Sequence, residues 1–269
     1  MHRQRCEHEY RGAVSVASPH TLEYRLLGGF RLSRSGAPVA PAAWGRPMAA
    51  RLARFLLVHR ESVPEDQLLE AFWPARDPVA ARRCLAVSVS RCRAVLGSAA
   101  LACNSRSYQL AISGTDSVDV DDFERASALA LARPAGRGRL TALEDAARLW
   151  TGEPLPEDRY ADWTREWREA LDDRHREVLV ALADAHAEAG EHGAALRIAR
   201  RMLELDPLDE GAHRRVMAAY AALGRRNRAF EQYLRCRRAL VDTLGVEPAH
   251  ETAALHARIL AGEKTLLAA

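Results

Sequence analysis

The spacing of apolar residues between positions 81 and 96 predicts a short helix with two unlike faces. At about 100° per residue, the apolar face carries Leu85, Val89, Cys92 and Leu96. The other side carries Arg83, Val87, Ser90 and Arg91. Gly97 follows at once and is a typical helix stop. The pattern by itself fits either a solvated arginine face or a face that meets a polyanion.

The neighbouring patterns favour the second interpretation. A helix is predicted over residues 65–73, with Leu68, Leu69, Phe72 and Trp73 buried and Pro74 as its stop. A strand hairpin is predicted over residues 101–112, with Arg106 at its tip. This order of elements is that of a winged helix-turn-helix, whose later helix enters the major groove of DNA.

Two further predictions precede these elements. Residues 22–32 alternate like a strand that is broken at Gly28-Gly29, and residues 37–39 form a return strand after a turn at 33–36. Residues 47–59 predict a helix with Pro47 in its first turn. Its apolar stripe carries Leu52, Phe55, Leu56 and His59, and its polar surface carries Arg46, Arg51 and Arg54.

Strand signals end after a hinge predicted at residues 114–117. The helices expected beyond it cover residues 120–132, 140–150, 162–189, 192–204, 209–223 and 226–244. The predicted fold class is therefore mainly α with a small β component, an N-terminal winged helix-turn-helix followed by an all-α domain.

The all-α part contains an internal repeat of 34 positions. Shifting residues 179–207 by this period pairs Leu182 with Val216, His186 with Tyr220, Gly190 with Gly224, Ala195 with Ala229, and Arg201 with Arg235. A period of 34, a glycine between helices and small residues at helix contacts are typical of tetratricopeptide repeats. Such repeats bind peptides or other domains, so this part is predicted to be a tetratricopeptide-like interaction domain.

Charge divides the chain in the same way. Residues 21–110 contain 13 arginines and 6 acidic residues, whereas residues 111–269 contain 23 basic and 28 acidic residues. A basic first part and an acidic second part are typical of two modules with different partners, the first of them a polyanion. No apolar run approaches the roughly 20 residues of a membrane span, and the five scattered cysteines suit a reducing compartment, so we expect a cytoplasmic protein without membrane contact.

No pattern of residues indicates a metal, a cofactor or an enzyme. The histidines are isolated and lack metal-ligand spacing. Asp119, Asp121 and Asp122 lack the glycine and terminal glutamate of a calcium loop, and we expect them to cap a helix that starts at Phe123. No phosphate-binding glycine loop and no nucleophile motif occurs, so no enzymatic activity, cofactor or metal is predicted.

Several motifs in the right order resemble the AfsR/SARP group, the Streptomyces antibiotic regulatory proteins. They lie at residues 26–28 (LLG), 68–74 (LLEAFWP), 82–97, 118–124 (VDVDDFE) and 244–248 (LGVEP). Residues 1–20 carry charge without a long apolar centre, which predicts a flexible tail or a misassigned start. The resemblance implies an OmpR-like winged helix DNA-binding domain at 21–113 and a bacterial transcriptional activator domain at 118–262. Two departures are Ser107, where the group commonly has glycine, and Cys92, where it usually has leucine.

The resemblance also implies a function. It implies a transcriptional activator that binds direct repeats in promoter DNA, associates with itself there and recruits RNA polymerase holoenzyme, at an antibiotic or other secondary-metabolite gene cluster. Arg83 is expected to pair with guanine, Val87 to meet a thymine methyl and Ser90 to reach a base or a phosphate. The remaining candidates for DNA contact, chiefly to phosphates, are Arg82, Arg91, Arg93, Arg46, Arg51, Arg54 and Arg106. The alternative is a protein-interaction adaptor whose winged helix makes protein contacts.

Overall fold

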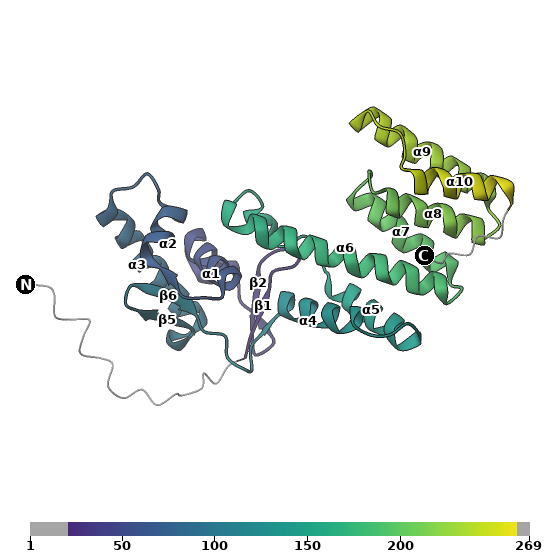
Figure 1. Ribbon diagram of the computed structural model, residues 1–269. Helices are drawn as coiled ribbons and strands as arrows, with labels where there is room; N and C mark the ends of the chain where they lie inside the picture. Colours follow the sequence, from purple (N-terminus) through teal and green to yellow (C-terminus); the bar gives the residue numbers. More distant parts are fainter. Residues whose placement is uncertain (1–20, 263–269) are drawn as a thin grey trace, which may run out of the picture. The chain divides into compact units, whose positions relative to one another are not determined.

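The computed structural model describes residues 21–262 and divides them into two compact units. Unit 1 runs to Asp119 and includes Leu155–Thr164, whereas unit 2 contains Val120–Pro154 and the chain from Arg165 onward. The tail expected at 1–20 lies outside the described residues. Helices dominate and strands are few, which confirms the predicted fold class (Figure 1). Within residues 21–262, no helix is both long and apolar enough to cross a membrane.

The first sheet of unit 1 has the strand order β3-β2-β1-β7. It contains β1 (Leu22–Arg25), β2 (Arg31–Arg34), β3 (Ala37–Pro38) and β7 (Ser117–Val118). The strand predicted at 22–32 is thus two antiparallel strands, because Gly28 and Gly29 turn the chain with φ values of 73° and 107°.

The hinge was predicted at residues 114–117, whereas the boundary between the two compact units falls after Asp119 and Ser117 already belongs to strand β7. Strand β7 pairs with β1 in parallel, and the Asp116 carboxylate accepts hydrogen bonds from the backbone N–H of Leu22 at 2.9 Å and of Ser113 at 2.8 Å. A two-residue strand is too short to leave an alternating pattern, so the sequence carries no sign of it.

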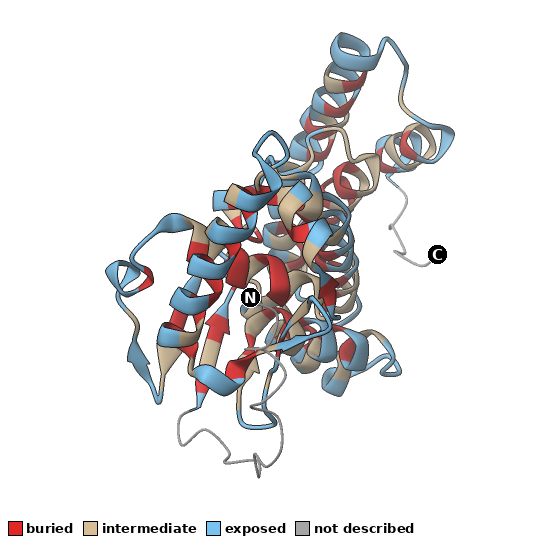
Figure 2. Cartoon of the chain, turned by 90° about the vertical axis from the view of Figure 1, so that its left-hand side faces the viewer, coloured by how far each residue is buried: buried red, intermediate tan, exposed pale blue. Residues whose placement is uncertain are grey.

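Three helices contribute most of the helical core of unit 1: α1 (Pro47–His59), α2 (Glu65–Phe72) and α3 (Pro78–Leu96). Helix α3 starts three residues earlier than predicted, because Pro78 occupies its first turn and the Asp77 carboxylate accepts from the N–H of Ala80 at 2.9 Å. The four residues of its apolar face are buried, as expected. Figure 2 shows buried residues gathered on the inner sides of these elements.

The predicted hairpin is confirmed as strands β5 (Leu101–Asn104) and β6 (Ser107–Leu110), which pair antiparallel. Strand β4 (Val63–Pro64) adds to β6, and short 3₁₀ turns lie at Pro41–Trp44 and Ser98–Ala100. Ser105 and Arg106 form the two-residue turn with φ values of 47° and 66°. Ser107, the departure noted above, keeps its strand position opposite Asn104.

Residues 155–164 fold with unit 1, although they lie beyond residue 118 in sequence. They contain the 3₁₀ turns Pro156–Asp158 and Asp162–Thr164. The N–H of Leu155 donates to the Leu26 carbonyl at 2.8 Å, the Glu157 carboxylate accepts from the N–H of Phe30 at 2.8 Å, and Trp163 packs 5.1 Å from Phe55. This segment therefore completes the core of unit 1.

Unit 2 is all-helical. Its helices are α4 (Asp119–Leu131), α5 (Arg137–Leu149), α6 (Arg165–Glu188), α7 (His192–Leu205), α8 (Glu210–Ala222), α9 (Arg226–Leu244) and α10 (His250–Ala261). Neighbours along the chain pack as antiparallel hairpins from α5 to α9, and α10 packs on α8 and α9. Helix α10 was not predicted.

The capping role expected for three aspartates is wrong. Helix α4 begins at Asp119 rather than Phe123, so Asp121 and Asp122 lie inside the helix. The Asp119 carboxylate instead accepts from the backbone N–H groups of Leu26 at 2.8 Å and Leu27 at 3.0 Å.

The 34-residue repeat is visible in the backbone. Gly190 and Gly224 have φ values of 75° and 72°, and each lies in the turn between two helices. In the first copy the N–H of Glu191 donates to the carbonyl of His186, and in the second the N–H of Arg225 donates to the carbonyl of Tyr220, both at 2.8 Å. The small residue Ala229 is fully buried where helices touch. Unit 2 is thus tetratricopeptide-like, as predicted.

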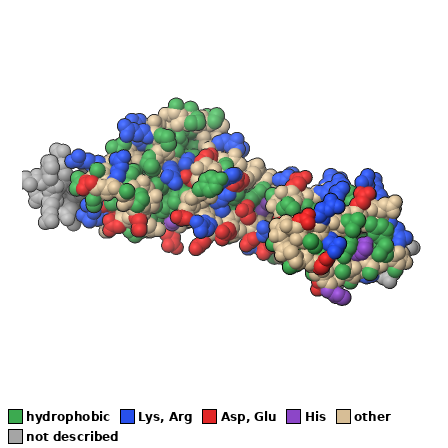
Figure 3. Space-filling model, turned by 90° about the horizontal axis from the view of Figure 1, so that it is seen from above, with side chains coloured by type: hydrophobic (Ala, Val, Ile, Leu, Met, Phe, Trp, Pro, Cys, Tyr) green, Lys and Arg blue, Asp and Glu red, His purple; other side chains and the backbone are tan. Residues whose placement is uncertain are grey.

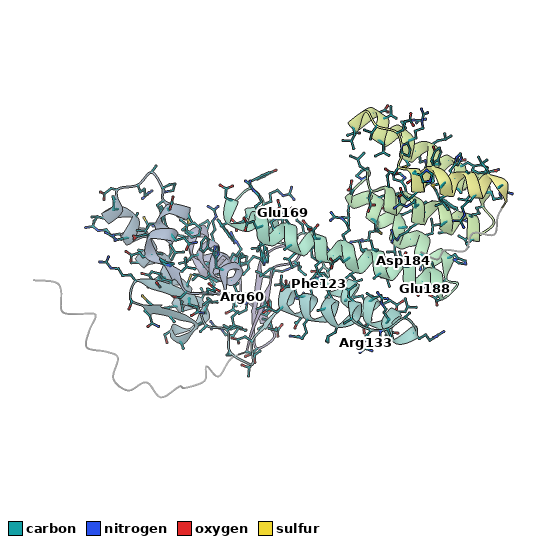
Figure 4. All side chains as sticks on the ribbon, in the orientation of Figure 1. Arg60, Phe123, Arg133, Glu169, Asp184 and Glu188 are labelled. Atoms are coloured by element: carbon teal, nitrogen blue, oxygen red, sulfur yellow. The ribbon has the colours of Figure 1, made fainter. Side chains whose placement is uncertain are left out.

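A buried histidine makes unit 2 sensitive to acid. His175 on α6 is 3% exposed, stacks on Trp150 with ring centroids 4.2 Å apart, and lies 6.3 Å from Phe123 of α4, which Figure 4 labels. Burial, followed by the charges of Arg201 and Arg176, lowers the pKa of His175 from 6.5 to about 4. The folded state therefore holds this imidazole neutral at pH values where the unfolded chain protonates it.

We expect the free energy of unfolding of unit 2 to fall as pH decreases from 6.5 towards about 4. The contribution of His175 is complete above pH 6.5, and up to about 3 kcal/mol is lost across this window. Urea unfolding at pH 7 and at pH 4.5 measures it. The His175→Phe variant keeps an aromatic ring without a titrating group and should flatten the pH dependence, and an unchanged slope would contradict the assignment.

Candidate nucleic-acid interface

One face of α3 is exposed and carries side chains suited to reading base edges. Arg83, Val87 and Ser90 follow one another at helical spacings of four and three, so they lie on one face. All three are exposed, and Val87 keeps 49% of its surface accessible although it is a large apolar residue. Arg83 and Ser90 form no side-chain hydrogen bond or ion pair with the residues that the structure describes. The face is therefore available to a partner.

The other α3 arginines differ in the contacts that their side chains make within unit 1. Arg82 pairs with Glu65 of α2 at 2.8 Å while its side chain stays 46% exposed. Arg91 is exposed, and its guanidinium lies against Gly45. A Cβ atom added to Gly45 would come within 2.7 Å of the Nη1 of Arg91. Arg93 donates from Nη2 to the Leu101 carbonyl at 3.1 Å. Arg93 thus holds the hairpin onto α3.

Two of the predicted phosphate-binding arginines lie outside α3 and are exposed. Arg106 projects from the β5–β6 turn, and its carbonyl accepts from the N–H of Glu65 at 2.8 Å, which ties the turn to the start of α2. Arg46 precedes the first residue of α1. Neither guanidinium has a hydrogen-bond or ion-pair partner in residues 21–262, so both charges are free for an external anion.

Arg51 and Arg54, also expected at phosphates, have an internal partner. Their Nε atoms lie 2.8 Å and 2.6 Å from the two carboxylate oxygens of Asp158, which is 3% exposed. The Arg54 side chain is 12% exposed and that of Arg51 is 36% exposed. These arginines hold residues 155–164 against α1. Sequence reasoning missed Asp158 because its partners lie 104 and 107 positions away, beyond any local pattern.

No metal centre accompanies this surface. Across residues 21–262, no group of three or more His, Cys, Asp or Glu side chains is arranged to hold an ion. The thiol of Cys92, the second departure noted in the sequence, lies in the core 3.1 Å from the Ala49 carbonyl, and burial raises its pKa to about 12. It is a packing residue between α3 and α1.

The bacterial transcriptional activator domain matches residues 118–260. The chain is 26% identical to the transcriptional regulatory protein MoaR1 of Mycobacterium tuberculosis, over 93% of this chain and 82% of that protein. It is 30% identical to the regulatory protein AfsR of Streptomyces coelicolor, over 91% of this chain but 25% of AfsR.

A solved structure is similar across both units. This is Mycobacterium tuberculosis EmbR in complex with a low-affinity phosphopeptide, with a TM-score of 0.75 and 26% sequence identity. The match covers 90% of this chain and 66% of the EmbR chain. The chain belongs to the bacterial transcriptional activator domain family and is a transcriptional regulator of the Streptomyces antibiotic regulatory protein type.

Proposed function

We propose that this protein is a sequence-specific DNA-binding activator that reads promoter DNA with α3 of unit 1. The observation that carries the proposal is the exposed α3 face, where Arg83, Val87 and Ser90 have no internal role. An exposed valine between polar groups has a function at a major groove, because it can contact a thymine methyl.

The contacts divide by chemistry. Arg83 forms a bidentate pair with O6 and N7 of a guanine, and Ser90 reaches a base or a phosphate. Arg46, Arg91 and Arg106 bind phosphates and fix the position of α3 on the duplex. Arg82 also binds a phosphate. Its exposed ion pair with Glu65 contributes little free energy, so a phosphate contact can replace it. Arg51, Arg54 and Arg93 are left out because they are bound internally.

The wider activity rests on the same surface and on unit 2. We propose that two or more molecules bind direct repeats, associate there and recruit RNA polymerase holoenzyme in the cytoplasm, at promoters of a secondary-metabolite cluster. The helical hairpins of unit 2 support this, since such repeats present surfaces to other proteins.

Electrophoretic mobility shift with duplexes selected from genomic fragments tests the proposal. The activator is expected to retain selected duplexes at salt concentrations that release unrelated ones. A protein-interaction adaptor would give only weak, salt-labile retention of every duplex. Transcription from a selected promoter with purified RNA polymerase then tests activation, and no rise in transcript would contradict that part alone.

Replacing the hairpin arginine is expected to weaken binding without changing sequence preference. Arg106→Ala removes one phosphate contact, so the affinity for all duplexes should fall by a similar factor. The slope of log K against log salt should decrease in magnitude by about one. Titrations at three salt concentrations measure both quantities. A loss confined to the selected duplex would mean that Arg106 reads bases.

A further inference from the structure

Unit 2 contains a pocket lined mainly by arginines. Its volume is about 690 Å³, and it lies between α7, the end of α8 and the first half of α9. The charged side chains that line it are Arg200, Arg225, Arg226, Arg228, Arg235 and Glu231. Figure 3 shows basic side chains grouped over these C-terminal helices. Five cations facing one anion produce a strong positive potential, whereas unit 2 as a whole is nearly neutral, with 22 basic and 23 acidic residues.

The repeat indicates that the fold does not require these arginines. Shifting back by 34 positions, the equivalents of Arg225, Arg226 and Arg228 are Glu191, His192 and Ala194. The two copies share the same turn and the same helix start. Since an acidic, an aromatic and a small residue serve in the first copy, the arginines of the second copy have another role.

Some of the pocket arginines are engaged within the unit. Arg228 pairs with Glu231 at 2.8 Å, Arg200 lies over the Tyr220 ring at 5.4 Å, and Arg226 donates to the carbonyl of Leu260 at 2.8 Å, at the end of α10.

Arg225 and Arg235 are different. Both are exposed, both line the pocket, and neither has a side-chain partner in the described part of the chain. Holding these two charges beside three others is unfavourable unless an anion enters.

We propose that this pocket binds a small ligand with two or more phosphate groups, of the nucleoside di- or triphosphate class. The volume is that of a small-molecule site and is too small for a duplex. Arg228 and Arg235 are seven positions apart on α9, which is about 10 Å along the helix axis. This distance is longer than a single phosphate group and suits the length of a polyphosphate chain. The amide of Asn227, also in the lining, offers a donor and an acceptor to the sugar or base.

The inference is separate from the DNA-binding proposal, because the pocket lies in unit 2 and α3 lies in unit 1. Isothermal titration of the full chain with ATP, pyrophosphate and inorganic phosphate tests it. The test variant is Arg225→Gln/Arg235→Gln. The matched control is Arg238→Gln, since Arg238 is an exposed arginine three positions further along α9 and outside the pocket lining.

We expect ATP and pyrophosphate to bind with a stoichiometry of one, and inorganic phosphate to bind at least tenfold more weakly. The double variant should raise the Kd for ATP by about 100-fold, since each charge-assisted hydrogen bond is worth more than a factor of ten. Arg238→Gln and Arg83→Ala should leave the Kd unchanged.

Three results would overturn the proposal. One is absence of ATP and pyrophosphate binding. Another is an ATP affinity that falls in Arg83→Ala rather than in the pocket variant, which would place the anion on unit 1. The third is binding of an oligoglutamate peptide with no binding of ATP, which would make the pocket a site for an acidic protein segment.

Discussion

The Arg83→Ala variant is expected to bind DNA without distinguishing its preferred base pair. A bidentate arginine–guanine pair discriminates against the wrong base by about 1–3 kcal/mol, and alanine offers no replacement. Because Arg83 has no partner among the described residues, its removal costs no internal contact and leaves the fold intact. The phosphate contacts remain, so the affinity for unrelated duplexes should change little.

Selection from a random duplex library, followed by binding titrations, measures the effect. The variant should lose one guanine position from the selected motif in each repeat, whereas Arg106→Ala should keep the whole motif. Thermal unfolding controls for stability. If Arg83→Ala selects the same motif as the unmodified chain, α3 does not read bases through this residue.

The Asp158→Asn variant is expected to destabilise unit 1 by about 3–5 kcal/mol. The Asp158 carboxylate is 3% exposed and binds Arg51 and Arg54 through separate oxygens. An amide of the same shape leaves the charge of Arg54, itself 12% exposed, without its counter-ion. Because residues 155–164 close over α1, their release also uncovers Phe55 where Trp163 packs.

Urea unfolding followed by tryptophan fluorescence measures this loss. Asp173→Asn is the matched control, because Asp173 pairs with Arg176 at 2.6 Å while the two side chains are 72% and 48% exposed. Exposed pairs contribute about 0–1 kcal/mol, so the control should unfold almost like the unmodified chain. Equal unfolding midpoints for both variants would show that the Asp158 cluster does not hold unit 1 together.

Local patterns predicted what depends on neighbours in sequence. The α3 stripe follows from apolar residues at helical spacing, so Leu85 and Cys92 were placed in the core correctly. The period of 34 predicted the paired turns at Gly190 and Gly224, because a repeat must reuse its backbone geometry. The first pattern lies within one helix, and the second recurs at a fixed spacing along the chain.

Contacts between distant segments could not be predicted in this way. Periodicity showed that Arg51 and Arg54 are on the polar surface of α1, but it cannot tell a phosphate from a carboxylate supplied by Asp158. The same holds for Arg93, which binds the Leu101 carbonyl instead of being free, and for the two-residue strand at Ser117. Arg51, Arg54 and Arg93 therefore have internal partners that no local pattern could show, and the DNA contacts of the other candidates stay predictions.

The central claim is that α3 lies in the major groove with Arg83 on a guanine, and dimethyl sulfate footprinting tests it most directly. The reagent methylates guanine N7, the atom that a bidentate arginine covers. On a selected promoter duplex, the unmodified chain should protect one guanine in each direct repeat, and Arg83→Ala should restore its methylation at saturating protein. Reactive guanine N7 atoms throughout a fully bound duplex, or identical protection by the variant, would contradict the claim.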